Sequence, residues 1–261
     1  MESIGFLLGI LIGISLGLIG GGGSILTIPV LVYIMGISPS NSTTYSLFIV
    51  GVATLIGSLK GIKDQMLNYR IAFFFGAPSI VSIFIMRKYI MPILPETLFS
   101  IADFSITKDL AIMLVFAILM IVASFSMIKK EISIQGLETK INSKEIILKG
   151  ILVGVLTGFV GVGGGFLIIP TLLFSANMPM RKAIITSLLI ITFNSLIGFA
   201  GSLNSDPIDW EFLLEFTAFA VVGILIGMYF SQKISNERLK PIFGWFILIM
   251  GIYILVKETL I

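Results

Sequence analysis

The chain has 261 residues, of which 57% are hydrophobic and only 12% are charged. That charged fraction is about half of the roughly 25% usual for soluble domains, so the composition excludes a soluble protein and predicts an integral membrane protein. Because the chain contains no His and no Cys, it also excludes disulfides, thiolate nucleophiles, imidazole bases and the usual zinc sites.

Apolar runs bounded by charges or by Pro and Gly predict the helices of the protein. In chain order they are 4–19, 24–35, 43–59, 69–86, 109–128, 146–160, 166–176, 183–203, 212–230 and 241–257. Several approach the roughly 20 residues that a membrane-crossing helix needs. The runs 24–35 and 166–176 reach only about 18 and 17 Å, roughly half of the hydrocarbon core. Each follows a glycine cluster, so we expect two broken, re-entrant helix hairpins.

An internal repeat explains why two short runs occur. With a shift of 141 residues, Gly9, Gly13 and Gly17 fall on Gly150, Gly154 and Gly158, and Pro29 falls on Pro170. Glycines that recur every four residues predict close packing between membrane helices. A constant offset through several segments indicates a tandem duplication. We therefore divide the chain into a first transmembrane repeat (1–128), a polar cytoplasmic linker (129–145) and a second transmembrane repeat (146–261).

The basic residues predict how the two repeats are oriented. If each broken helix enters and leaves on the same side, 13 of the 17 basic residues face the cytoplasm, and Arg87, Lys88, Lys108 and Lys257 lie outside. If each broken helix instead crosses the membrane, the division is nine against eight. The positive-inside rule favours the first arrangement. The expected fold is all-α and polytopic, with two inverted repeats of a broken hairpin plus three transmembrane helices, and with both termini outside.

The glycine clusters themselves are the first candidate binding site. Runs of glycine stop a helix and permit backbone conformations closed to other residues. The helix that restarts after each cluster presents free N–H groups, which suit an anion. Inversion lets the two clusters meet near the membrane midplane, as in many secondary transporters; a purely structural tight turn is the alternative. The residues concerned are Gly20, Gly21, Gly22, Gly23, Ser24, Gly161, Gly163, Gly164 and Gly165.

These motifs resemble a known family. The segments GGGGSILTIP (20–29) and GVGGGFLIIP (161–170), with Thr-Tyr-Ser-Leu (44–47) and Thr-Ser-Leu (186–188) after them, are similar to the TauE/SafE (sulfite exporter) family. The resemblance covers nearly the whole chain and both repeats. It implies movement of sulfite, sulfoacetate or related sulfur-containing anions across the cytoplasmic membrane, usually outward. Tyr45 stands where the family more often has Thr.

Polar side chains within the predicted spans supply the second set of candidate contacts. No Lys, Arg, Asp or Glu falls well inside any of the predicted spans. The hydroxyls of Thr44, Ser46, Thr186 and Ser187 are expected one turn into helices that face the glycine clusters, with Asn194 two turns further along. Hydrogen bonds between or within helices are the alternative role for each of them.

The sequence therefore predicts a multi-pass transporter of small anions that works by alternating access. The partners expected are a small inorganic or organic anion and the lipid bilayer, with no nucleic acid, no metal and no cofactor. A passive anion channel and a membrane-embedded accessory protein without transport are the alternatives. Without His, Cys or carboxylates in the predicted spans, we expect no enzyme and no catalytic residue.

Overall fold

The expected polytopic all-α architecture is confirmed. The computed structural model of the chain describes residues 2–21, 23–63, 67–101, 104–128, 143–175, 178–203, 207–231 and 236–260. Most of these residues are helical, and each of the apolar runs predicted from the sequence falls on a helix.

The first half of the chain contains long helices, two short π-helical segments (η) and a small hairpin. In chain order these are α1 (Glu2–Ile19), α2 (Ser24–Pro29), η1 (Val30–Ile34), α3 (Pro39–Lys63), α4 (Tyr69–Ile85), η2 (Met86–Ile90), α5 (Met91–Ile93), β1 (Thr97–Ile101), β2 (Phe104–Thr107) and α6 (Lys108–Ile128). The second half is helical in all its described segments. Its helices are α7 (Ser143–Val160), α8 (Gly165–Ser175), α9 (Met180–Ser202), α10 (Trp210–Ser231) and α11 (Asn236–Leu260).

Several helices have the length and hydropathy of membrane spans. Within the described ranges, five qualify: Pro39–Leu59, Tyr69–Ile93, Lys108–Phe125, Lys182–Ser202 and Trp210–Ser231. The apolar helices Leu7–Ile19 and Ser24–Ile34, on either side of the first glycine cluster, are shorter. The chain is therefore a multi-pass membrane protein, and the inversion of its two halves stays a prediction.

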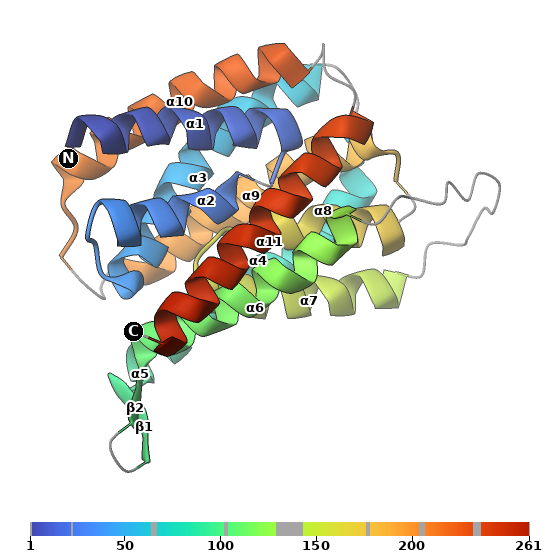
Figure 1. The fold of residues 1–261 in the computed structure, drawn as a ribbon. Coiled ribbons are helices and arrows are strands. Elements are labelled where there is room, and N and C mark those ends of the chain that lie inside the picture. Colours follow the sequence, from blue (N-terminus) through green and yellow to red (C-terminus); the bar gives the residue numbers. More distant parts are fainter. Residues whose placement is uncertain are drawn as a thin grey trace.

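The two halves pack by exchanging helices. Figure 1 shows α1 lying along α10, and α7 lies along α4 in the same way. With the shift of 141 residues found in the sequence, α1 corresponds to α7 and α10 to α4. Each helix that precedes a glycine cluster is thus packed on a helix of the other half. Two further pairs join equivalent helices of the halves: α3 with α9, and α6 with α11.

Glycines make these exchanged contacts possible. A methyl group built at Gly13 would collide with the carbonyl oxygen of Ala220, and one built at Gly154 would lie 2.5 Å from the carbonyl oxygen of Ser79. Both members of the second pair follow from the first through the same shift, because Gly154 is equivalent to Gly13 and Ala220 to Ser79. Small residues let helix backbones approach closely where lipid supplies no hydrophobic force. The internal correspondence therefore extends from the sequence to the packing.

We expect Gly13→Ala to destabilise the protein, although Ala is the better helix former. The new methyl group has no room against the α10 backbone, and overpacking of this kind costs about 1–3 kcal/mol. The matched control is Gly76→Ala, whose methyl group would meet only Ile190, at 3.5 Å. That variant should unfold at or above the wild-type temperature because Ala favours helix over Gly. Thermal unfolding in detergent compares the two, and equal stability would contradict the close α1–α10 contact.

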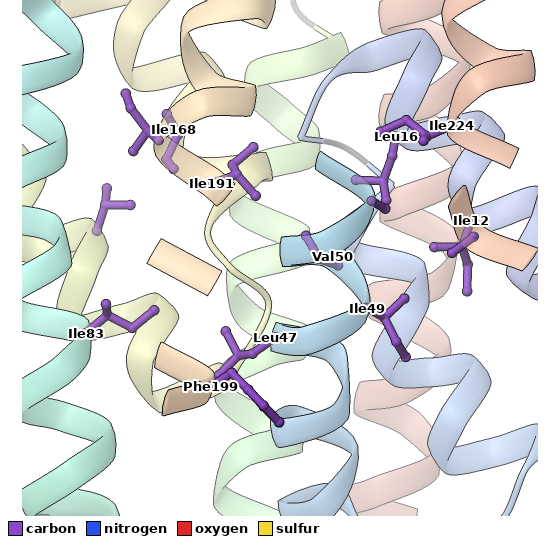
Figure 2. Packing of buried hydrophobic residues seen from close by; sticks show 14 of the residues in the cluster. Ile12, Leu16, Leu47, Ile49, Val50, Ile83, Ile168, Ile191, Phe199 and Ile224 are labelled. Atoms are coloured by element: carbon purple, nitrogen blue, oxygen red, sulfur yellow. The ribbon is translucent and has the colours of Figure 1, made fainter. Parts of the chain in front are cut away.

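The hydrophobic core is shared between the halves. Figure 2 shows Leu47 of α3 beside Phe199 of α9, with Ile83 of α4 and Ile168 of α8 nearby. All four side chains are buried. Because one core cluster draws on both repeats, neither half has this core to itself.

A small β-hairpin precedes α6, and the sequence pattern does not predict it. Strands β1 and β2 pair antiparallel, with Phe99 opposite Ile106 and Ser100 opposite Ser105. Strands of five and four residues are too short for a period-two pattern to stand out beside long apolar helices. The hairpin projects from one end of the helical body (Figure 1).

Candidate functional site

The helices are interrupted at both glycine clusters, and the interruptions have equivalent backbone conformations. Helix α1 ends before Gly20, which has φ +85°, and α7 ends before Gly161, which has φ +79°. Gly163 and Gly164 also have positive φ values, of 65° and 84°. Glycine adopts this left-handed region at little cost, whereas other residues do not. We call these two segments, 20–23 and 161–164, the first and second break.

The chain segments at the two breaks touch each other. A methyl group built on Gly21 would overlap backbone atoms of Gly165, and one built on Gly165 would overlap those of Gly21. Backbone therefore meets backbone at this point, with no room for a side chain on either residue. Gly23 lies against the end of α1, and the Ser24 hydroxyl donates to the Gly21 carbonyl at 2.7 Å. Gly22 lies outside the described residues.

One expectation about the spans is wrong, because Arg87 lies inside one. Its side chain is only 3% exposed, and it falls within the span Tyr69–Ile93. The helix does not end at residue 86 but continues through η2 and α5, which keeps Arg87 within the protein. In the sequence, the neighbouring Lys88 makes the pair look like an interfacial charge cluster, and Lys88 is indeed exposed. The helix continuation is the signal that the sequence pattern lacks.

Arg87 lies beside the second break with part of its guanidinium unpaired. Its Nη1 donates to Thr43 Oγ1 at 2.9 Å, and Thr43 in turn donates to the Ser40 carbonyl at 2.7 Å. A methyl group built on Gly161 would overlap both Arg87 Nη2 and Thr43. Nε and Nη2 have no hydrogen-bond partner. The absence of a side chain at Gly161 thus keeps the second break next to the free edge of the guanidinium.

This arrangement is energetically costly for a protein that has no ligand for it. Burying an unpaired charge costs several kcal/mol, and buried donors left unsatisfied add about 1–3 kcal/mol. Within the described ranges, Arg87 is the one charged side chain among the buried residues, and no carboxylate pairs with it there. A buried cation with free donors is suited to binding an anion.

Further unpaired polar atoms lie near the second break. Ser195 Oγ lies against Gly163 and has no partner. Asn194, the next residue on α9, donates from Nδ2 to Ser79 Oγ at 2.8 Å, while its Oδ1 is unpaired. Asn194 was expected from the sequence to line the site. Arg87, Thr43 and Ser195 were not selected there, because the helix face that meets the second break cannot be read from the sequence.

The other predicted hydroxyls have different surroundings. Thr186 accepts a hydrogen bond from the Asn68 backbone N–H at 3.2 Å, and Ser187 donates to the Ile184 carbonyl at 2.7 Å. Both therefore serve helix contacts or their own helix. Thr44 is buried, and the buried Ser46 hydroxyl has no partner. It is the neighbouring Thr43, not Thr44, that lies against the second break.

A polar cavity lies one helical turn from Thr43. Its volume is about 670 Å³, and its lining includes Ser38, Ser40, Asn41, Glu96, Thr97 and Lys108. Ser40 belongs to both the cavity wall and the hydrogen-bond chain that runs through Thr43 to Arg87. The cavity therefore connects the surface beside the β-hairpin to the buried guanidinium through a short chain of polar groups.

Comparisons with known proteins agree on a membrane transport family. A family model described as sulfite exporter TauE/SafE matches residues 5–254. A probable membrane transporter protein of Xylella fastidiosa (strain Temecula1) is 28% identical over 252 residues, covering 94% of this chain and 91% of the relative. A probable membrane transporter protein of Methanocaldococcus jannaschii is 24% identical over 265 residues, covering 95% and 93%. No solved structure matches the chain.

Proposed function

The chain belongs to the sulfite exporter TauE/SafE family, and on that premise we propose that it carries small anions, chiefly sulfur oxyanions, across the cytoplasmic membrane. The family and the relatives named as probable membrane transporters support transport as such. The anionic nature of the substrate, outward transport and alternating access are the finer parts of the proposal.

The single observation that carries the anion assignment is the buried guanidinium of Arg87 beside the second break. It has two nitrogens without partners and is 3% exposed. A metal cation or an organic cation would be repelled at such a site. Because the site lies next to the segment where backbone of the two halves meets, at Gly21 and Gly165, movement at this contact would change access to a bound anion.

The exchanged packing indicates which parts of the molecule would move together. Helix α1 lies on α10 and α7 lies on α4, with glycine contacts too close to slide easily. In our proposal each rocking unit therefore contains helices of both sequence halves, and the two units meet at the α3–α9 contact. The correspondence of these contacts under the 141-residue shift supports a two-fold relation between the halves, as inverted repeats require.

Transport into or out of vesicles is the direct test of this proposal. We expect proteoliposomes that contain the purified full chain to take up or release labelled sulfite, sulfoacetate or a simple carboxylate faster than protein-free liposomes. A carrier should saturate with anion concentration, whereas a passive channel should conduct without saturation over the same range. Failure to move any anion of this panel in either direction would refute the proposed function.

The proposed topology has its own test, which uses the natural absence of Cys. In our proposal both termini are outside, so single cysteines placed at positions 2 and 261 should react with an impermeant maleimide added to intact cells. A cysteine at Lys144, at the start of α7, should react only after the cells are opened, since the linker end is expected in the cytoplasm. Protection of either terminal cysteine would contradict the inverted arrangement.

A further inference from the structure

The surroundings of the two breaks are equivalent in geometry but opposite in polarity. Gly161 faces Thr43 and Arg87, whereas Gly20, its equivalent 141 residues earlier, faces Ile184. Ile184 is itself the equivalent of Thr43. The same contact therefore occurs twice, once with polar partners and once with an apolar one.

The same contrast holds for the other polar residues of the second break. Applying the 141-residue shift, Arg87 is replaced by Met228, Ser79 by Ala220 and Asn194 by Ala53. Ala53 and Ala220 are fully buried, so these positions are part of an apolar core in the first-break half. The duplicated architecture thus contains one polar site and one apolar counterpart.

From this asymmetry, and resting on the proposed function, we infer that the protein binds one anion per chain, at the second break, and that Arg87 is the residue that recognises its charge. We further infer that the ligand is anionic throughout and carries no ammonium group. The first break closes against the second as backbone and apolar side chains, without a binding site of its own.

The free edge of Arg87 has the geometry that an oxyanion requires. The N–H bonds of Nε and Nη2 run side by side along one edge of the planar guanidinium, and together they bind two oxygens of a carboxylate or a similar group. These are the two nitrogens that lack partners, while Thr43 holds Nη1 at the other end. Thr43 thus acts as a positioning residue that orients the edge.

The polar groups around this edge explain the exclusion of zwitterions. The neighbours of the guanidinium and the second break are Thr43, Gly161, Gly201 and Ser195, with no carboxylate among these described residues. An ammonium group that entered with the anion would lose its hydration and find a cation nearby with no acidic partner. Burying a charge without a partner costs several kcal/mol, so a zwitterion should bind much more weakly.

Two sulfonates that differ in one group test this inference on the purified full chain in detergent. Isethionate carries a hydroxyl where taurine carries an ammonium group. By titration calorimetry we expect isethionate to bind with a stoichiometry near one and taurine to bind at least about tenfold more weakly. Arg87→Met should weaken isethionate binding by about tenfold or more, and Arg87→Lys by an intermediate factor because it keeps the charge and loses the two-nitrogen edge. Lys88→Met, which removes the exposed neighbouring charge, should bind as the wild type does.

The outcomes separate this inference from the proposed function. If anions are transported by the wild type and equally well by Arg87→Met, the Arg87 assignment is overturned while anion transport stands. Equal affinity for taurine and isethionate, or two anions per chain, overturns the one-sided site. If the wild type neither binds nor transports isethionate, sulfite, sulfoacetate or acetate, the proposed function and the inference both fail.

Discussion

Gly165→Leu is expected to abolish transport while the protein still folds and inserts into the membrane. The side chain would have to occupy the space now filled by the Gly21 backbone, because even a methyl group built on Gly165 overlaps it. If the two breaks separate during transport, this collision exists only in the state in which they touch. The variant should then be held in another state of the cycle instead of being unfolded.

The smaller change Gly165→Ala should give a graded result. Overpacking by one methyl group costs about 1–3 kcal/mol, which corresponds to a reduction of about 5- to 150-fold in the population of the state with touching breaks. Flux in proteoliposomes measures this effect, with thermal unfolding measured in parallel. Gly76→Ala is the control, since Gly76 is also buried in a helix but has room for a methyl group. Wild-type flux in Gly165→Leu would show that transport does not need the contact.

Arg87→Met is expected to make the protein more stable while transport is lost. The wild-type guanidinium is buried with two nitrogens unpaired, and replacing buried charges by apolar side chains of similar volume often stabilises a protein by about 1–4 kcal/mol. Met fills the space and needs no partner, as Met228 does at the equivalent position. Denaturant or detergent-induced unfolding of the purified protein measures the difference.

Added anion should reverse this order of stability. A ligand that binds only the folded protein at about 100 times its dissociation constant stabilises it by about 2.7 kcal/mol. The wild type should gain this stabilisation with isethionate, and Arg87→Met should gain none. Lys88→Met should differ from the wild type by no more than about 0.5 kcal/mol, as is usual for exposed positions. A loss of stability in Arg87→Met without ligand would mean that the arginine has a structural role.

The positions of the helices could be predicted from the sequence because they depend on local chemistry. Runs such as 43–59 and 183–203 are long and apolar, and in a bilayer a helix satisfies every backbone group within its own segment. The interruptions at Gly20 and Gly161 follow from consecutive glycines, which weaken a helix wherever they occur. The repeat was visible because its glycines are spaced identically in both halves.

The candidate site could be predicted only in part, because membership depends on contacts between distant segments. Gly161 and Gly163 were expected in the site, and the structure shows which side chains they face: Thr43 and Arg87 for the first, Ser195 for the second. Thr43 and Thr44 are adjacent in the sequence, and a rotation of about 100° per residue along a helix separates a residue that meets the second break from one that does not. Hydropathy along the chain contains no information about that rotation relative to other helices.

The shortage of charge in the sequence by itself determined that this is a membrane protein, that its helices are broken by glycine at two equivalent places, and which family motifs it carries. Only the tertiary structure decided that α1 packs on α10 and α7 on α4, and that Arg87 lies inside the protein. The physical reason is the continuation of α4 through η2 and α5, which places a charge beside Gly161 that a count of basic residues assigns to the membrane surface. A charged residue at the end of an apolar run is interfacial or buried according to what packs around it, and that is settled by the fold.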